Sequence, residues 1–186
     1  MKIAALDMDG TVYVDENITE AVKEAIAAWR AAGNLAVSAT GKSIANVRGT
    51  LEPFDVKLDY HVLYNGTVLT EGDYTVLHEE HLAADTVIAI AERFTGRALN
   101  IYTTGLTGAD QIVWDGLSGQ ESSMVAGAQV GDLGDVAKRD TVLMSLWIPG
   151  DAALRQEVDE WVRANCDVES SFNCDFYDIM PPEIGR

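Results

Sequence analysis

Two aspartates, Asp7 and Asp9, stand one residue apart at the end of an apolar run, in the segment LDMDGT of residues 6–11. Successive side chains of a strand alternate between its two sides, so both carboxylates face one way and Met8 faces the other. Carboxylates about 6–7 Å apart repel each other unless a cation, a shared proton or a basic group neutralises them. Mg²⁺ meets this need, because it pairs one or two carboxylates with a substrate phosphate. One aspartate can then attack a phosphoryl group while the other moves a proton.

The two residues after Asp9 also suit a ligand site. Gly10 lets the backbone approach a ligand closely, and Thr11 offers a hydroxyl and an amide. The alternative interpretation is an acidic turn that caps the following helix. Because DxDGT follows directly on an apolar first strand, the pattern favours a site.

A second polar segment, SATGKS of residues 38–43, also ends an apolar run. Neighbouring parallel strands bring their carboxyl ends together, so Thr40, Gly41 and Lys42 are expected beside the aspartates. A hydroxyl, free amides at a helix start and a lysine can hold an anion. The alternative is a strand-to-helix turn in which serine or threonine caps the helix. A P-loop, GxxxxGK[ST], is disfavoured because Ala36 occupies the position of its first glycine.

The first 70 residues supply a frame for these segments. The predicted elements alternate between strands at 3–7, 34–40 and 60–70 and helices at 19–33 and 41–54. Thr19 can cap the first helix and Gly33 can end it. This β-α-β-α-β order is typical of a parallel sheet covered by helices.

From residue 71 the pattern changes to a smaller α/β unit with antiparallel strands. Its predicted strands are 74–82, 98–104, 111–116 and 141–149, and its predicted helices are 83–96 and 151–166, the second capped by Asp151. Residues 167–180 follow the second helix. The sequence therefore divides into an α/β part of residues 1–70, a second part of residues 71–180 and a linker of residues 181–186.

Composition limits the classes of partner. The 186 residues include 13 basic and 30 acidic side chains, for a formal net charge of −17. This charge argues against broad nucleic-acid binding and against anionic membrane surfaces. No apolar run approaches the roughly 20 residues that a membrane-spanning helix needs. Two cysteines without CxxC spacing suit a reducing cytoplasm, so the protein is expected to be cytoplasmic.

The pair LDMDGT and ATGK resembles the haloacid dehalogenase superfamily of phosphatases and phosphotransferases. The order of parts is similar to its Cof-like branch, in which a DxDGT strand, a TGR-type strand and an NGA-type strand precede an inserted cap of type IIB. Here the three motifs are LDMDGT, SATGKS and YNGTVL. The resemblance covers essentially the whole chain. It implies a Rossmann-like parallel core, represented by three strands in residues 1–70, and an inserted α/β cap with an antiparallel sheet in residues 71–180. Residues 181–186 would be the return linker.

The resemblance also implies roles for particular residues. Asp7 would be the nucleophile that forms an aspartyl-phosphate, and Asp9 would be the general acid/base. Mg²⁺ would be bound by the Asp7 carboxylate and the Asp9 carbonyl. The phosphate and the rest of the substrate would contact residues of three loops, namely Gly10, Thr11, Thr40, Gly41, Lys42, Asn65 and Gly66. Lys42 stands where the branch usually has arginine, so the bidentate phosphate contact is lost.

The family pattern continues past the cap with a phosphate-neutralising lysine and an acidic GDxxND motif, and neither is present in this sequence. Three interpretations stay open: a truncated or proteolysed fragment, a missing part supplied by a partner chain, or a degenerate relative. Without that part the first strand is expected to be a bare sheet edge, which invites self-association. The 186 residues alone are expected to give little or no turnover.

These observations predict a Mg²⁺-dependent phosphatase, a phosphoric monoester hydrolase, of small phosphorylated metabolites such as sugar phosphates. Nucleic acids and membranes are not expected as partners. The alternative is a truncated or degenerate module that binds a phosphorylated ligand without catalysis.

Overall fold

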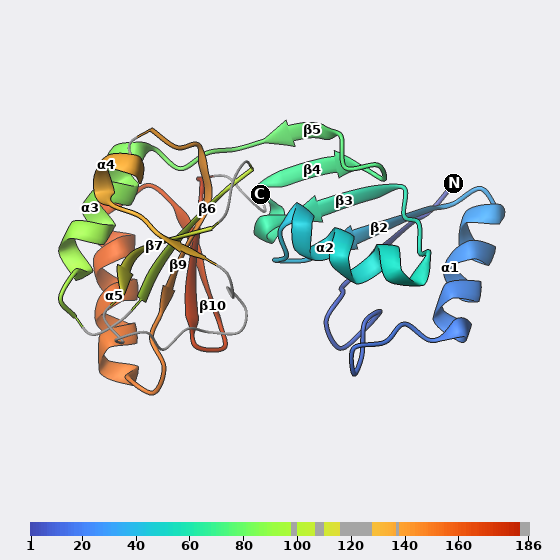
Figure 1. The fold of residues 1–186 in the computed structure, drawn as a ribbon, viewed down its shortest axis with the longest axis horizontal. Helices are drawn as coiled ribbons and strands as arrows, with labels where there is room; N and C mark the ends of the chain where they lie inside the picture. Colours follow the sequence, from blue (N-terminus) through green and yellow to red (C-terminus); the bar gives the residue numbers. More distant parts are fainter. Residues whose placement is uncertain (98–99, 107–109, 116–127, 137, 183–186) are drawn as a thin grey trace. The chain divides into compact units, whose positions relative to one another are not determined.

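The computed structural model describes residues 1–97, 100–106, 110–115, 128–136 and 138–182. The chain forms two compact units, Met1–Glu79 and Glu80–Arg186, and each is described by itself. The predicted α/β fold is confirmed, with parallel strands in the first unit and a largely antiparallel sheet in the second (Figure 1). None of the described helices combines the length and the apolar composition that a membrane span requires.

The first unit is a mixed sheet in which the strands lie in chain order, β1-β2-β3-β4-β5. Strands β1, β2 and β3 are parallel, and β4 and β5 continue the sheet in antiparallel fashion. The strands are β1 (Ile3–Leu6), β2 (Leu35–Ala39), β3 (Tyr60–Leu63), β4 (Val68–Glu71) and β5 (Val76–Glu79). The helices are α1 (Glu20–Ala31), α2 (Ile44–Leu51) and two short 3-10 turns, η1 (Glu52–Phe54) and η2 (Tyr64–Gly66).

Two features of this sheet differ from the sequence-based expectation. The turn expected at Asn65-Gly66 is present as η2, but residues 60–70 form two strands rather than one, because the chain reverses there and β4 pairs back on β3. The boundary between the two parts was expected at residue 70, whereas the two compact units divide after Glu79. The first unit extends further because β5 pairs with β4 and so belongs to the first sheet.

Local signals account for the ends of the helices. The Thr19 side chain accepts a hydrogen bond from the backbone amide of Val22 and so caps α1. Gly33 follows the helix with a φ of 78°, in the left-handed region that glycine enters without steric cost. In the second unit, the Asp151 carboxylate accepts a hydrogen bond from the amide of Leu154, at 2.9 Å, at the start of α5 (Ala152–Asn165). The predicted caps are confirmed.

The second unit is a six-stranded sheet with the order β10-β11-β9-β6-β7-β8. All strand pairs are antiparallel except β7 with β8. The strands are β6 (Asn100–Gly105), β7 (Gln111–Asp115), β8 (Gln129–Val130), β9 (Thr141–Trp147), β10 (Glu169–Asn173) and β11 (Phe176–Met180). The helices are α3 (Ala84–Phe94), α4 (Leu133–Val136) and α5. Parts of the predicted strands 98–104 and 111–116 and of the linker 181–186 lie outside the described residues.

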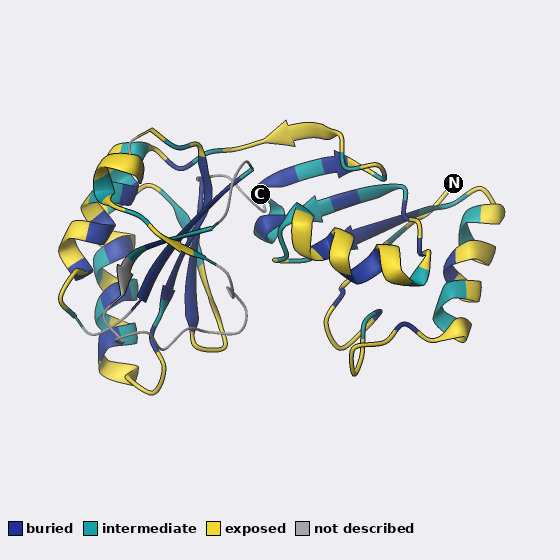
Figure 2. Cartoon of the chain, in the orientation of Figure 1, coloured by how far each residue is buried: buried dark blue, intermediate teal, exposed yellow. Residues whose placement is uncertain are grey.

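Helices α3 and α5 lie together on one face of this second sheet (Figure 1). The core between them is built from side chains of both helices and of the central strands, and Figure 2 shows these strands as buried. Its fully buried members include Phe94 of α3, Val158 of α5 and Leu146 of β9. The second unit therefore has a core of its own.

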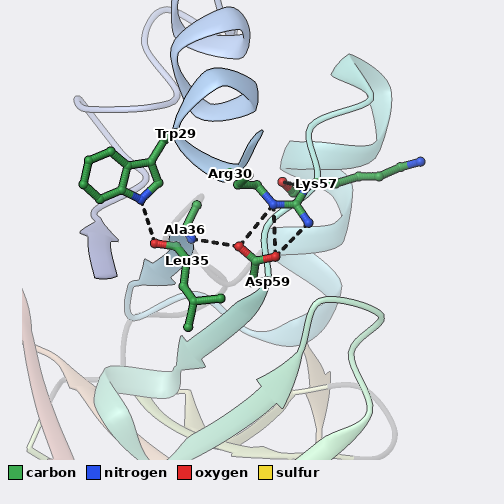
Figure 3. A network of polar contacts seen from close by, with 6 residues as sticks. All are labelled: Trp29, Arg30, Leu35, Ala36, Lys57 and Asp59. Atoms are coloured by element: carbon green, nitrogen blue, oxygen red, sulfur yellow. Dashed lines mark hydrogen bonds and ion pairs between the residues drawn. The ribbon is translucent and has the colours of Figure 1, made fainter. Parts of the chain in front are cut away.

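A charged network ties α1 to the starts of β2 and β3 in the first unit (Figure 3). The Arg30 guanidinium donates to both carboxylate oxygens of Asp59, at 2.8–3.1 Å, and to the Lys57 carbonyl at 2.9 Å. Asp59 in turn accepts from the backbone amide of Ala36 at 2.8 Å. The Arg30 hydrogen bond is the main cause that lowers the pKa of Asp59. The half-buried pair therefore fixes three elements that begin far apart in sequence.

Replacing Asp59 with Asn removes the charge that faces Arg30 and is expected to lower the free energy of unfolding of the first unit by about 1–3 kcal/mol at pH 7. The pKa of Asp59 in the folded state lies below the ordinary aspartate value of about 3.9. The stabilisation is therefore fully present at any pH above that ordinary value. It is lost as the pH falls through the lower folded-state pKa. Urea titrations of both proteins between pH 7 and pH 3, read by hydrogen exchange in β2 and β3, test this.

The matched control is Asp55→Asn, on the same loop. The Asp55 side chain is 91% exposed and lies 3.9 Å from the Lys57 ammonium, so its replacement is expected to change the free energy of unfolding by less than about 0.5 kcal/mol. Equal effects of the two substitutions would contradict the structural role of the Asp59 network.

Candidate active site

The first candidate segment leaves the sheet at the carboxyl end of β1. Met8 is fully buried, whereas Asp7 and Asp9 are exposed on either side of it. The Asp7 carboxylate accepts a hydrogen bond from the Met8 amide at 2.8 Å. Because β1 is the outer strand of the described sheet and Ile3 is 65% exposed, the aspartates project beside an open sheet edge.

The residues that follow form a tight turn around the buried Met8. Its carbonyl accepts hydrogen bonds from the amides of Thr11, Val12 and Tyr13, at 2.8–3.3 Å, and the Gly10 amide donates to the Tyr13 carbonyl at 2.9 Å. Gly10 has a φ of 73°, which explains why glycine follows the second aspartate. Since the amides of Gly10 and Thr11 are already bonded within the turn, a ligand here would meet the Thr11 hydroxyl.

The two candidate segments meet through an ion pair. The Lys42 ammonium lies 3.0 Å from a carboxylate oxygen of Asp9, with side chains that are 22% and 64% exposed. Leu6 at the end of β1 pairs with Ser38 of β2, so the two strands end at the same edge of the sheet. An exposed pair of this kind adds at most about 1 kcal/mol of stability. Its importance is the placement of a cation beside the paired acids.

The turn that carries Lys42 is held at both of its ends. The Thr40 amide donates to the Val62 carbonyl of β3 at 3.0 Å, and the Thr40 hydroxyl accepts from the Lys42 amide at 3.3 Å. Ser43 then caps α2, because its side chain accepts from the Asn46 amide at 3.2 Å. The helix-cap interpretation is therefore correct for Ser43, and it leaves Thr40 and Lys42 at the end of β2.

Asn65 and Gly66 form the third loop of the site, after β3. The Asn65 amide donates to the Thr40 carbonyl at 3.4 Å. A methyl group in place of a hydrogen on Gly41 would lie 2.6 Å from the Asn65 side-chain oxygen. The Asn65 side chain thus packs directly on Gly41, which explains the glycine at that position.

The structure brings together five of the predicted site residues through direct contacts, namely Asp9, Thr40, Gly41, Lys42 and Asn65. Asp7, Gly10, Thr11 and Gly66 lie in the same loops, and within the described residues none of them makes a hydrogen bond or ion pair with another of the three loops. Sequence reasoning missed Tyr64, whose hydroxyl accepts a hydrogen bond from the Ile44 amide at 3.1 Å. The only signal for it was an aromatic residue directly before an Asn-Gly turn.

The donor set of the two aspartates fits a hard cation. Each carboxylate has one oxygen engaged, by the Met8 amide and by Lys42 respectively, and the second oxygen of each has no partner among the described residues. No group of three or more His, Cys, Asp or Glu side chains able to hold a metal occurs in that part of the chain. Mg²⁺ needs fewer, since it usually keeps waters and binds through one or two carboxylates and a phosphate. Asp7 and Asp9 therefore suit Mg²⁺ better than a metal that needs a full protein cage.

A cavity of about 550 Å³ in the first unit lies apart from these residues, and none of them lines it. It lies near the start of β3 and is lined by three cationic and three carboxylate side chains together with His61 and Tyr74. Burial lowers the pKa of His61, so its imidazole is neutral at pH 7 and accepts or donates in a 2.8 Å hydrogen bond with Ser38. With balanced charges, this cavity has no net attraction for a phosphate.

A sequence model of haloacid dehalogenase-like hydrolases matches residues 4–131 of the chain. YxeH of Bacillus subtilis strain 168, which carries a provisional name as a phosphatase, is 37% identical over 71 residues. That match covers 37% of this chain and 26% of YxeH, so it spans about a quarter of the relative.

Solved structures share the fold over nearly the whole chain. The sugar phosphatase BT4131, of subclass IIB of the haloacid dehalogenase superfamily, superposes with a TM-score of 0.77 at 18% identity over 99% of this chain and 71% of its own. A haloacid dehalogenase-like hydrolase from B. subtilis superposes with a TM-score of 0.80 at 14% identity. The match covers 99% of this chain and 74% of the hydrolase. BT1666 from Bacteroides thetaiotaomicron, a phosphatase of the same superfamily, superposes with a TM-score of 0.77 at 17% identity. The match covers 99% of this chain and 68% of BT1666.

The contact between Gly41 and Asn65 makes a testable prediction. Gly41→Ala places a methyl group against the end of the Asn65 side chain, so that side chain must rotate away, at an expected cost of at most about 1 kcal/mol in the free energy of unfolding. Gly49→Ala in α2 is the control, because a methyl group there meets nothing within 4 Å and alanine favours a helix by about 0.5–1 kcal/mol. Thermal unfolding of both variants measures the difference, and a stabilising Gly41→Ala would contradict this packing.

Proposed function

The chain belongs to the haloacid dehalogenase-like hydrolases, and from that premise we propose that it is a Mg²⁺-dependent phosphatase of small phosphorylated metabolites such as sugar phosphates. The observation that carries this proposal is the 3.0 Å ion pair between Asp9 and Lys42. It joins the acidic loop after β1 to the Thr40–Lys42 loop after β2, so that a nucleophile, a proton carrier and a cation occupy one edge of the sheet.

The chemistry follows from the two carboxylates. An oxygen of Asp7 attacks the phosphorus of the ester, the bond from phosphorus to the leaving oxygen breaks, and Asp9 in its protonated form gives a proton to the leaving alcohol. Asp9 then takes a proton from a water molecule that attacks the phosphorus of the aspartyl-phosphate. Inorganic phosphate leaves, and the carboxylate of Asp7 is restored.

The other loop residues bind the phosphoryl group in this proposal. The ammonium of Lys42 and the hydroxyls of Thr40 and Thr11 are donors for its oxygens. Asn65 supplies an amide group above Gly41. Mg²⁺ held by the Asp7 carboxylate and the Asp9 carbonyl would neutralise charge on the transferring phosphoryl group, and the Asp9 carboxyl would be left to carry the proton.

Sugar phosphates are the proposed substrate class because BT4131, a sugar phosphatase by its description, shares the fold of the chain. The second unit is proposed to be the cap, which selects the leaving group. A cytoplasmic location agrees with Cys166 and Cys174, both of which are free.

One observation favours a second candidate function, that of a module that binds a phosphorylated ligand without hydrolysing it. The Asp9 side chain is 64% exposed, and β1 is an outer strand. Electrostatic catalysis gains strength from the exclusion of water, so exposed acids with one nearby lysine suit binding better than turnover. The two functions differ in hydrolysis and share ligand binding.

Substitution of the two aspartates separates these functions. The 186 residues alone are expected to release phosphate slowly at most, so with Mg²⁺ and a panel of sugar phosphates any release by the wild type is expected to be abolished by Asp7→Asn and strongly reduced by Asp9→Asn. Asp7→Asn should still bind the ester, as measured by calorimetry. Asp15→Asn, an exposed residue of the following loop, is the control and should act like the wild type. Ester binding by the wild type without any release of phosphate would instead support the binding module.

Removal of the metal gives an independent test. Chelation by EDTA is expected to weaken the binding of inorganic phosphate at least about tenfold, because the protein carries a formal charge of −17 and Lys42 alone must then offset the two aspartates. Restoring Mg²⁺ should restore the affinity. An affinity for inorganic phosphate that changes neither with EDTA nor with added Mg²⁺ would contradict the metal assignment.

A further inference from the structure

Tyr64 adopts a backbone conformation that its residue type disfavours. The φ angles of Tyr64, Asn65 and Gly66 are 50°, 59° and 105°, so three successive residues lie in the left-handed region. Glycine enters this region freely and asparagine tolerates it, but a bulky aromatic residue there is an outlier. Such a residue costs on the order of 1–3 kcal/mol and persists only where its surroundings hold it.

The backbone of Tyr64 is held on both sides. Its amide donates to the Lys42 carbonyl at 3.2 Å, and its carbonyl accepts from the amide and the hydroxyl of Thr67 at 3.4 and 3.1 Å. The residue is 3% exposed. The strained turn therefore places the Tyr64 amide directly against the loop that carries Lys42.

The side chain of Tyr64 reaches the other side of the same loop. Its hydroxyl accepts from the amide of Ile44 at 3.1 Å. Ile44 is the first residue of α2, and the first amides of a helix have no partner within the helix. The Ser43 side chain already accepts a hydrogen bond from the Asn46 amide. Tyr64 therefore adds a second side-chain cap, at the Ile44 amide that directly follows Lys42 and Ser43.

We propose that Tyr64 is a positioning residue that holds the Lys42 loop from both ends, so that the Lys42 ammonium stays beside Asp9. This inference rests on the proposed function of that site. A strained turn is needed because the Tyr64 amide must reach the Lys42 carbonyl while its hydroxyl reaches the amide of Ile44. The residue touches no substrate in this role and acts through Lys42.

The test compares Tyr64→Phe with Tyr60→Phe, alone and in a Lys42→Ala background. Tyr60 begins β3, the strand that leads into Tyr64, and its hydroxyl makes no hydrogen bond in the part of the chain that the structure describes. The probe is inorganic phosphate with Mg²⁺, measured by calorimetry. Tyr64→Phe is expected to raise the dissociation constant about five- to tenfold, the effect of one hydrogen bond. In the Lys42→Ala background, Tyr64→Phe should not raise the dissociation constant further. Tyr60→Phe should leave the dissociation constant unchanged in both backgrounds.

A second measurement needs no ligand. Tyr64→Phe should speed amide hydrogen exchange in residues 42–46 by a similar factor, and Tyr60→Phe should leave it unchanged. A lower melting temperature with unchanged exchange in residues 42–46 overturns the proposal, and so does an effect on phosphate affinity that persists undiminished in Lys42→Ala. If the wild type binds no phosphate with Mg²⁺, the proposed function fails, and the exchange measurement alone decides the role of Tyr64.

Discussion

The parallel pairing of β1, β2 and β3 is the constraint on which the candidate site depends. Parallel strands end at the same edge of a sheet, and the pairs Leu6 with Ser38 and Ala39 with Val62 set the register of these ends. Each of the three loops departs within a few residues of its strand end. Segments separated by more than 50 residues in sequence, from Asp9 to Asn65, therefore come together, the first two loops through the Lys42 side chain and the last two through backbone and Asn65 contacts.

The electrostatics of the site follow from this convergence. A chain with a formal charge of −17 repels anions at long range, so attraction for a phosphate must come from groups within a few ångströms. Lys42 is the group that the structure places there, at 3.0 Å from Asp9. The same lysine that neutralises an aspartate when no ligand is present is thus available to a phosphoryl oxygen, and its position is controlled by Thr40 on one side and Tyr64 on the other.

Sequence reasoning succeeded where a local pattern determines the outcome. The alternation around Met8, the caps at Thr19 and Asp151 and the neighbouring strand ends at Asp9 and Lys42 all depend on short-range rules. It failed where the outcome depends on distant partners. Whether β5 joins the first or the second sheet depends on which edge is free to pair. The left-handed conformation of Tyr64 depends on contacts with Lys42 and Ile44, which no pattern in YNG reveals.

The order of strands in the two sheets has a consequence for folding during synthesis. In the first unit each strand pairs with the strand made just before it, so its contacts are short in sequence and each new strand adds to an existing edge. In the second unit β9 lies between β6 and β11. The pairing of these three strands therefore cannot form until most of that unit has left the ribosome. Because local contacts form faster than distant ones, we expect the first unit to be structured while the second is still incomplete.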